Sequence, residues 1–175
     1  MDIKKDDIRI RNAGEADCEQ LAAWWNDGTV MAHAGFPLGL GTTAEDIQGQ
    51  LGTDSDETGR RLIIEYKSSP IGEMNYRNME NGTAEIGIKI CEPSFQERGL
   101  GRVILSLFIR ELFAMGYSKI ILDTNLKNER AQHVYEMLGF RRLRVNIDAW
   151  KDQLGVPQSF VDYELAPENF RDHSA

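Results

Sequence analysis

The stretch Cys91-Glu92-Pro93-Ser94-Phe95-Gln96-Glu97-Arg98-Gly99-Leu100-Gly101-Arg102 decides how the chain is interpreted. It places two glycines, Gly99 and Gly101, between a predicted strand and the start of an amphipathic helix. Unpaired amides at a helix N-terminus favour negative charge, and glycine lets the backbone come close to a phosphate. Arg98 and Arg102 add positive charge to a chain that is acidic overall. The stretch therefore predicts an anion-binding site, with a plain tight turn as the alternative.

The chain before this stretch contains patterns typical of four strands and two helices. Alternation with period two predicts strands, and apolar residues at spacings of three and four predict helices. In chain order these are a strand over Ile8–Arg11, helices over Glu15–Trp25 and from Thr42 to Leu51, and strands over Arg61–Tyr66, Ile71–Tyr76 and Ala84–Ile90. Many breakers between residues 26 and 42 predict a loop-rich excursion. Asn81-Gly82 is a hairpin signal, so the last three strands are expected to form an antiparallel meander.

The chain after the stretch has the order of a parallel crossover unit. The expected elements are a helix ending at Gly116, a buried strand over Ile120–Leu122, a helix over Glu129–Leu138, and strands over Phe140–Val145 and Ser159–Leu165. The polar tail after Pro167 is expected to be frayed. The predicted fold is α/β of the α+β type, with a mixed, mostly antiparallel sheet of six or seven strands and about four helices.

Composition bounds the class of protein. With 175 residues, 41% hydrophobic and 27% charged, the chain predicts one globular domain over residues 1–175, with a core over about 8–166 and a tail over 167–175. A net charge of −8 argues against nucleic acid as a partner and would suit a cationic amine. No apolar run approaches the length of a membrane span, so we expect a cytoplasmic protein. The two cysteines and three histidines show no metal-ligand spacing, so no metal is expected.

Two motifs in this order carry a family resemblance. Gln96-Glu97-Arg98-Gly99-Leu100-Gly101 matches Gln/Arg-x-x-Gly-x-Gly/Ala, whereas a P-loop or a Rossmann fingerprint would need other spacings. Asn128 is followed seven residues later by Tyr135 and then by Leu138-Gly139-Phe140. With both motifs in a matching order of elements from Ile8 to Leu165, the chain resembles the GNAT superfamily of N-acetyltransferases. It looks like the branch that contains ribosomal-protein N-terminal and aminoglycoside-type acetyltransferases.

The resemblance implies acetyl-CoA as co-substrate, bound in a cleft where two parallel strands splay apart. By this resemblance the amides from Glu97 to Arg102 hold the pyrophosphate, and the backbone of the preceding strand end bonds the pantetheine as an added strand would. The residues implied in cofactor binding are Lys89, Ile90, Cys91, Gln96, Glu97, Arg98, Gly99, Leu100, Gly101, Arg102, Asn128 and Tyr135.

The resemblance also implies direct transfer to an amine in a ternary complex. Tyr135 would lie near the thioester sulfur, where its hydroxyl can donate a proton, although its spacing alone fits a core aromatic. The amine must lose a proton, and Asp123, Glu85 or a water molecule are the candidate bases. Asp123 has a turn or cap acceptor as its alternative role, and Glu85 a salt bridge. Cys91 as a nucleophile has no suitably spaced histidine, which favours a packed strand cysteine.

The variable segments 24–41 and 146–160 are expected to choose the amine substrate. Trp25, His33, Phe36 and Trp150, with the neighbouring Trp24, are candidates to line its pocket, and Asp27, Asp148 and Asp152 are candidates to attract a cation. The alternative is that these aromatics fill the core and the aspartates are solvated. Peptide or protein N-termini, aminoglycosides, polyamines and other amines all stay open as substrates.

Two functions of other classes stay open as well. One is a noncatalytic acyl-CoA-binding regulatory module, and the other is an interaction protein that reuses the fold. Tyr135 and Asp123 count against the first. Proteins that look like this chain are commonly dimers, so a homodimer is a further expectation.

Overall fold

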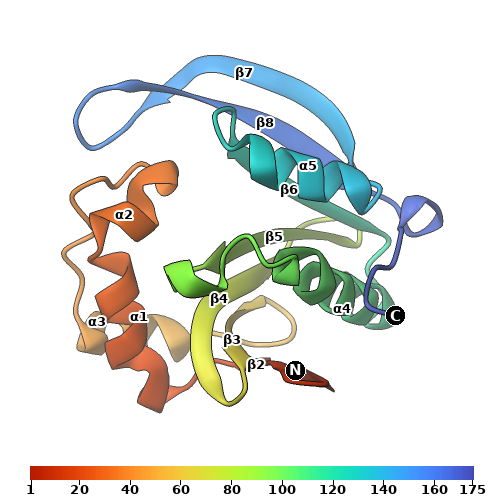
Figure 1. Ribbon diagram of the computed structural model, residues 1–175, viewed down its shortest axis with the longest axis horizontal. Helices are drawn as coiled ribbons and strands as arrows, with labels where there is room; N and C mark the ends of the chain where they lie inside the picture. Colours follow the sequence, from red (N-terminus) through yellow and green to blue (C-terminus); the bar gives the residue numbers. More distant parts are fainter.

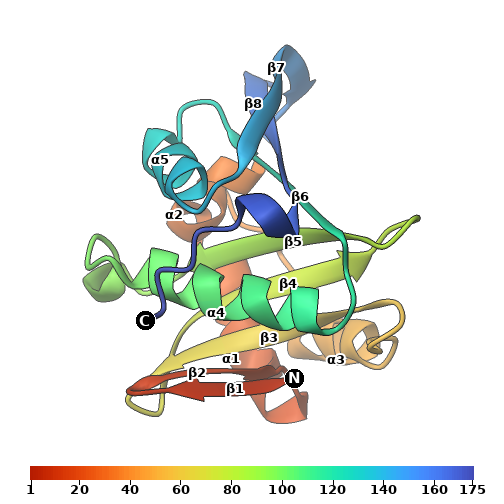
Figure 2. The ribbon, with the colours of Figure 1, turned by 90° about the vertical axis from the view of Figure 1, so that its right-hand side faces the viewer.

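One eight-stranded sheet runs through the computed structural model, which describes residues 1–175, and helices cover both faces of the sheet (Figures 1 and 2). The strands are β1 (Asp2–Lys5), β2 (Ile8–Asn12), β3 (Gly59–Tyr66), β4 (Ser69–Asn78), β5 (Thr83–Ile90), β6 (Lys119–Asn125), β7 (Arg141–Lys151) and β8 (Pro157–Leu165). The helices are α1 (Cys18–Trp25), α2 (Gly28–Met31), α3 (Ala44–Leu51), α4 (Leu100–Ala114) and α5 (Glu129–Met137).

The strand order in the sheet is β1-β2-β3-β4-β5-β6-β8-β7, and every neighbouring pair is antiparallel except β5 and β6. The predicted class, a mixed and mostly antiparallel sheet with one parallel pair, is therefore confirmed, as is the meander β3-β4-β5. The numbers of elements differ from the prediction. The sheet has eight strands where six or seven were expected, and there are five helices where about four were expected.

The additional elements have local physical causes. Strand β1 has a single apolar residue, Ile3, because an edge strand needs no continuous apolar face. Helix α2 forms one turn inside the segment predicted as loop, where the Asp27 carboxylate caps its start by accepting from the Thr29 N–H at 2.8 Å. Strand β7 continues to Lys151 because a bulge between Asn146 and Trp150 interrupts the alternation without ending the strand.

Apolar side chains of the sheet pack on both faces. The larger core lies under α4 and α5, where Ile104, Phe108 and Leu112 of α4 have no exposed surface. Burying one such side chain contributes about 1.5–3 kcal/mol. The smaller core lies under α1 and α3 on the opposite face. We call these the α4 face and the α1 face of the sheet (Figure 2).

The C-terminal tail is packed against the α4 side, so the expectation of a frayed tail was wrong. The N–H of His173 donates to Ser106 Oγ at 2.9 Å, and Ser174 is only 2% exposed. Phe170 also packs edge-on against Phe113 with ring centroids 5.9 Å apart. Composition alone missed these contacts because the polar tail residues bond to groups of α4 and α5 that are distant in the sequence, such as Ser106, Arg110 and Met137.

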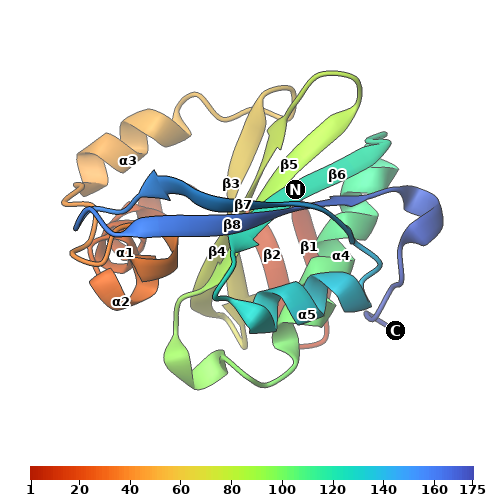
Figure 3. The ribbon, with the colours of Figure 1, turned by 90° about the horizontal axis from the view of Figure 1, so that it is seen from above.

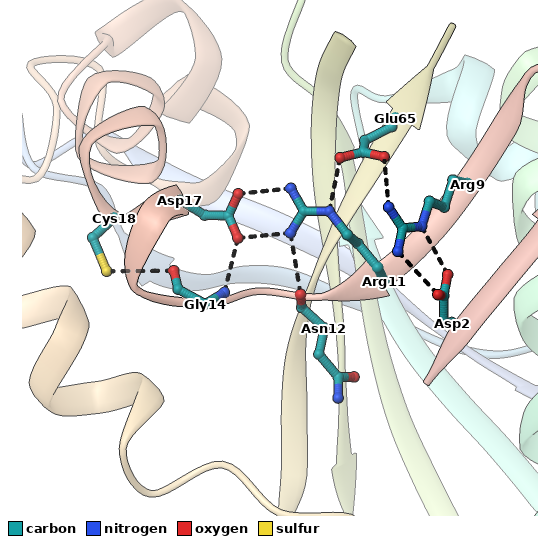
Figure 4. Close-up of polar contacts among 8 residues, drawn as sticks. All are labelled: Asp2, Arg9, Arg11, Asn12, Gly14, Asp17, Cys18 and Glu65. Carbon is teal, nitrogen blue, oxygen red and sulfur yellow. Dashed lines mark hydrogen bonds and ion pairs between the residues drawn. The ribbon is translucent and has the colours of Figure 1, made fainter. Parts of the chain in front are cut away.

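A chain of ion pairs fixes the start of α1 against the sheet (Figure 4). Arg11 on β2 donates to both oxygens of Asp17 at 2.8 Å and to Glu65 on β3 at 2.7 Å. Arg9 links Glu65 to Asp2 in turn. Burial acts to raise the pKa of Asp17, but the bonds from Arg11 and from the Gly14 N–H outweigh it and hold that pKa below its usual value. The network therefore orients α1 on the sheet.

The hairpin of β7 and β8 extends beyond the other strands of the sheet and reaches the segment after α2 (Figures 1 and 3). Near its tip, Gln153 accepts from the Leu38 N–H at 2.9 Å and donates to the Gly39 carbonyl at 3.0 Å. The ring of Trp150 lies against Gly35, where an added Cβ would come within 2.3 Å of it. The two segments predicted to be variable thus contact each other. No helix of the chain is long and apolar enough to cross a membrane.

Candidate active site

The parallel strands β5 and β6 pair over three residues only and then separate. The register joins Thr83 to Lys119, Ala84 to Ile120 and Glu85 to Ile121, and no pairing continues beyond Glu85. Past this point β5 keeps its antiparallel partner β4 but loses β6. The predicted splay is therefore present, and it leaves one edge of β5 open.

The backbone direction along β5 decides which groups face that open edge. The Cys91 N–H donates to the Ile71 carbonyl at 2.9 Å, and the Lys89 carbonyl lies against Gly72 of β4. Because successive residues of a strand direct their backbone groups to opposite sides, those of Ile90 and Ile88 face the gap. The backbone groups of Lys89 and Cys91 thus face β4, and only those of Ile90 and Ile88 face the gap, while the predicted bonding of a ligand along this strand end stays a prediction.

The loop from Gln96 to Gly99 joins the end of β5 to α4. Gln96 Nε2 donates to the Ile90 carbonyl at 2.9 Å, which ties the loop to the strand end. Glu97 and Gly99 take positive φ angles of 61° and 74°, and the Arg98 guanidinium lies 5.3 Å from the centroid of the Phe95 ring. No side chain caps the start of α4 at Gly99. The first amides of α4 therefore have no side-chain partner and are free for an anion.

Of the two glycines of the motif, only one is required by the backbone conformation. Gly99 has a left-handed φ of 74°, which the turn into the helix requires. Gly101 lies inside α4 with ordinary helical geometry, and an added Cβ would meet only Ile90 Cδ1, at 4.0 Å. Nothing in the fold requires a glycine at position 101. The tight-turn interpretation thus holds for Gly99, whereas anion binding at Gly101 stays a prediction.

Helix α5 begins beside this loop. Asn128 caps it by accepting from the Ala131 N–H at 3.2 Å, so its carbonyl oxygen is used within the chain while its amide nitrogen has no protein partner. Arg130, in the first turn, forms an ion pair with Glu97 of the loop, and both side chains are exposed. Two segments about thirty residues apart in the sequence therefore meet at the start of α5.

Tyr135 points from α5 into the core near the splay. Its ring packs against Phe140 and Tyr163 with centroids 5.7 and 5.8 Å apart, and the residue is 7% exposed. Its hydroxyl forms no hydrogen bond within the protein, and it is not fully buried. Burial, the charge of Asp123 and the neighbouring Tyr163 raise the pKa of Tyr135 well above its usual value. The side chain is therefore both a core aromatic and a protonated, unengaged donor.

Asp123 lies on β6 just beyond the point where β5 separates. Its neighbours Ile120 and Leu122 are in the core under α4, so by strand alternation its side chain is on the α1 face, where it is exposed. It accepts no hydrogen bond and lies opposite Asp162 of β8. Desolvation, and then the charges of Asp162 and Glu85, raise the pKa of Asp123 above its usual value. This carboxylate therefore has a raised pKa and no hydrogen-bond partner, and it caps no helix or turn.

Glu85 is on the same face of the sheet and already has a partner. Arg77 of β4 donates to its carboxylate at 2.8 Å. The salt bridge weighed for Glu85 from the sequence is present. Among the two candidate carboxylates, Asp123 is the one without a partner.

Cys91 has the environment of a packed cysteine. It is 3% exposed within the smaller core, and its thiol donates to the Lys89 carbonyl at 3.7 Å. Burial and the negative charge of Glu73 raise the pKa of Cys91 to about 12. A thiol that stays protonated at neutral pH is a poor nucleophile.

Two adjoining cavities, of about 430 and 280 Å³, lie on the α1 face between the helices α1 and α3 and the strands β3 and β4. Trp25, Gln50 and Arg61 line both cavities. The smaller cavity is also lined by Glu73 and Lys89. The adjacent Trp24 is 4% exposed, and its Nε1 donates at 2.8 Å to Oε1 of Glu92, a residue that follows the end of β5.

The other residues proposed for the amine pocket lie away from these cavities. His33 and Phe36 are exposed in the segment after α2, and Trp150 packs on Gly35. Asp27 caps α2, and Asp152 accepts from the Leu154 and Val156 N–H groups at 2.9 Å at the turn before β8. Asp148 is exposed with a φ of 47°. Trp25 is the one residue of the predicted aromatic set that lines these two cavities.

The sequence reasoning missed the polar residues around the cavities. Glu73 is 2% exposed and receives hydrogen bonds from Trp25 Nε1 at 3.0 Å and from Arg61 Nη1. Lys89 Nζ lies 3.5 Å from the same carboxylate. One signal was visible, namely a glutamate in the middle of a predicted strand, because a charge that becomes buried there needs a partner.

Comparison with known proteins identifies the family. Residues 7–141 match the family model described as an acetyltransferase (GNAT) domain. A mycothiol acetyltransferase of Propionibacterium freudenreichii is 26% identical over 140 residues, which cover 76% of this chain and 43% of that protein. The L-amino acid N-acyltransferase MnaT of Escherichia coli is 28% identical over 144 residues, covering 76% of this chain and 79% of that protein.

The fold is shared with solved structures. The structure of spermidine N-acetyltransferase from Vibrio cholerae in complex with CoA and spermine superposes with a TM-score of 0.83 at 19% identity, covering 94% of this chain and 98% of that chain. The chain spans less than half the length of the mycothiol acetyltransferase it matches. Since the family model covers most of the chain, this protein belongs to the GNAT acetyltransferase family.

Proposed function

We propose that the protein is an N-acetyltransferase that transfers the acetyl group of acetyl-CoA directly to a primary amine. The observation that carries this proposal is the uncapped N-terminus of α4 beside the open edge of β5. A helix N-terminus binds phosphate, and an open strand edge binds an extended chain that carries amide groups. CoA joins a pyrophosphate to such a chain, so the two features together fit one ligand.

The residues around the splay fit acetyl-CoA as follows. The amides from Glu97 to Arg102 are proposed to bind the pyrophosphate, with Arg98 and Arg102 adding positive charge and Gly101 leaving space. The backbone of Ile88 and Ile90 is proposed to bond the pantetheine, and the free amide nitrogen of Asn128 to contact the same arm. When bound, acetyl-CoA supplies an acetyl group activated as a thioester.

The protein itself handles two protons in this proposal. Asp123, with a raised pKa and no bonded partner, takes the proton from the ammonium group of the substrate, directly or through a water molecule. Tyr135 Oη holds a proton because its pKa is raised, and it can deliver this proton to the leaving sulfur. The charge of Asp123 acts on Tyr135, so the base and the acid lie near each other at the splay.

Two alternatives are weighed against this proposal. A noncatalytic acyl-CoA-binding module would have no need of two unengaged groups with raised pKa values at the splay, so Asp123 and Tyr135 favour an enzyme. An amine at a protein N-terminus is the alternative substrate class. The relatives named above carry names for different substrates, so the comparisons leave the amine open.

Calorimetric titration with acetyl-CoA, followed by an assay of free thiol release, tests the proposal. The panel of amines contains amino acids, polyamines, aminoglycosides and short peptides. We expect saturable binding of acetyl-CoA and thiol release that depends on the added amine. A folded sample that binds no acetyl-CoA would contradict the family role, and binding without thiol release from any amine would favour the noncatalytic module.

A further inference from the structure

The cavities on the α1 face carry positive charge inside an acidic protein. The charged residues that line the smaller cavity are Arg61, Lys89 and Glu73, and the larger one is lined by Arg60, Arg61, Arg77 and Asp54. Both linings therefore hold more cations than anions, although the whole chain has a net charge of −8. In the larger cavity Arg60 and Arg77 form ion pairs with Asp56 and Glu85, so the excess positive charge lies at the smaller cavity. A cavity that existed to attract a polycation would have the opposite balance.

Glu73 holds two cations and neutralises only one of them. Burial acts to raise its pKa, but the charges of Arg61 and Lys89 and the bonds from Trp25 and Arg61 outweigh burial and hold the pKa of Glu73 below its usual value. The carboxylate is therefore ionised. One positive charge is left over at the smaller cavity.

This positive charge is held in a fixed place. The Arg61 guanidinium lies 4.8 Å from the centroid of the Trp25 ring and bonds to Glu73, so its plane is held from two sides. The side chains of Arg61 and Lys89 are 27% and 32% exposed, so both are open to a ligand in the cavity. A preorganised pair of this kind binds a compact anion such as a carboxylate or phosphate.

The sheet register aligns this pair with the splay. Arg61 is opposite Asn75, and Asn75 is opposite Gly87 on β5. Since Glu85 pairs with Ile121 in parallel, Gly87 is level with Asp123 across the gap. Neighbouring strands are about 4.8 Å apart, so Arg61 and Gly87 are about 10 Å apart at their Cα atoms. The long arginine side chain shortens that separation.

Arg61, Asn75, Gly87 and Asp123 form a row across the strands, and the middle of this row offers a hydrogen-bond acceptor for an amine. Gly87 has no side chain, and an added Cβ would lie 2.6 Å from Asn75 Oδ1, so the amide oxygen of Asn75 lies over the backbone of β5. The Asn75 side chain has no hydrogen bond within the protein and lines the larger cavity. Its oxygen accepts hydrogen bonds, which suits an ammonium or amine. The row thus runs from a cationic end at Arg61 to an acidic end at Asp123.

We propose that the amine substrate is a small molecule that also carries a compact anionic group, with the anion bound by Arg61 and Lys89 and the amine held between Asn75 Oδ1 and Asp123. This inference rests on the proposed function and names the substrate class for the same site. The cavity volumes of about 280 and 430 Å³ lie at the small end of the range for ligand pockets. Amino acids and phosphorylated amines share the required chemistry, whereas spermidine lacks the anion.

The experiment compares matched amines in wild type and Lys89→Gln. Each amino acid is paired with its α-amide, which removes the charge at nearly constant size, and phosphoethanolamine is paired with ethanolamine. Lys89 is the residue to change because Glu73 keeps Arg61 as partner in that variant, so no buried charge is left alone. Lys89→Arg keeps the charge, and Lys67→Gln removes an exposed lysine at the far β3–β4 turn as a control.

The measured quantity is the ratio of kcat/KM for the anionic amine to that for its neutral partner. Differences in intrinsic amine reactivity cancel when this ratio is compared between variants. We expect Lys89→Gln to lower the ratio by about 10-fold or more, the size of a lost charge-assisted hydrogen bond, and Lys89→Arg to restore most of it. Lys67→Gln should leave the ratio unchanged. The pair that shows the effect distinguishes a carboxylate from a phosphate.

Two results would overturn the inference while leaving the proposed function intact. One is efficient acetylation of spermidine or of the neutral partners, with a ratio that Lys89→Gln does not change. The other is thiol release with peptides only. Absence of both acetyl-CoA binding and thiol release would instead reject the proposed function, and with it the substrate class.

Discussion

The two sides of β5 are built from different kinds of parts. On the side of the gap, the proposed acetyl-CoA site uses backbone amides of consecutive residues, from Glu97 to Arg102, and the open edge of one strand. On the α1 face, the proposed amine site uses side chains from four separate elements. The sheet register brings Arg61, Glu73 and Lys89 together, and Trp25 of α1 packs on Arg61 and bonds to Glu73. A backbone site depends on local conformation, whereas a side-chain site depends on tertiary pairing.

This difference predicts how each side responds to mutation. Changes on the gap side should alter the affinity for acetyl-CoA through backbone shape and space, with little regard to the amine. Changes on the α1 face should alter the preference among amines and leave the affinity for acetyl-CoA alone. Tyr135 and Asp123, which lie where the two sides meet, should affect turnover with every amine.

Tyr135→Phe is expected to have the largest effect. Removing the hydroxyl takes away a proton donor of a kind that contributes about 100-fold to 10 000-fold to turnover. The ring keeps its packing on Phe140 and Tyr163, so the Kd for acetyl-CoA should stay within about twofold, since only a group acting in the transition state is lost. Stopped assays of thiol release and calorimetry measure the two quantities.

Tyr76→Phe is the matched control for this variant. Tyr76 is 2% exposed, its ring packs against Phe108 and Tyr117, and its buried hydroxyl has no hydrogen-bond partner, so the change removes an unsatisfied polar group inside the core. Turnover should be unchanged, and thermal stability should stay the same or rise. If Tyr135→Phe kept wild-type turnover, the leaving sulfur would need another proton source.

Asp123→Asn is expected to have the next largest effect, and its pH dependence is informative. The pKa of Asp123 is raised, so its ionised fraction, and with it kcat/KM, should increase as pH rises through that pKa. The ratio of wild type to variant should therefore increase with pH and then level off, at about 100-fold or more for a lost general base. Glu85→Gln is the comparison, because Glu85 is bonded to Arg77 and should matter less. A larger loss in Glu85→Gln than in Asp123→Asn would reverse the assignment of the base.

More of the gap side could be predicted from the sequence, because that side is local. The order of elements and the helix start after Gly99 were predicted from residues adjacent in the chain, and the splayed pair was implied by the family resemblance that two short motifs carry. The direction of single backbone groups could not be predicted, because it depends on the pairing of Cys91 with Ile71 of another strand. Strand β1 and the full length of β7 were also missed, since exposed edge strands need no apolar alternation.

The α1 face could not be predicted from the sequence for a different reason. Glu73 lies opposite Lys89 only because β4 and β5 pair in one register, and it reaches Arg61 only through β3. The sequence reasoning relied on aromatic residues near predicted loops, and of these Trp25 is the one that lines the two cavities on the α1 face. Trp150 instead packs on Gly35, a contact that depends on where the β7–β8 hairpin ends.

Gly101→Ala gives the smallest effect and the sharpest separation of fold from ligand binding on the gap side. Position 101 has ordinary helical geometry, and an added Cβ would meet only Ile90 Cδ1 at 4.0 Å, so the fold accepts alanine. Replacing a helical glycine should stabilise the protein by about 0.5–1 kcal/mol. The methyl group would occupy the space proposed for the pyrophosphate, so the Kd for acetyl-CoA should rise by about tenfold, or about 1.4 kcal/mol.

Gly49→Ala is the matched change in α3, where nothing lies within 4 Å of an added Cβ. It should stabilise the protein by a similar amount and leave the Kd for acetyl-CoA unchanged. Thermal unfolding and calorimetry on both variants separate the two effects, because stability and affinity should move in opposite directions only for Gly101→Ala. If Gly101→Ala were stabilised but bound acetyl-CoA with wild-type affinity, Gly101 would not be making space for the ligand. The proposal that the first turn of α4 binds the pyrophosphate would then be contradicted.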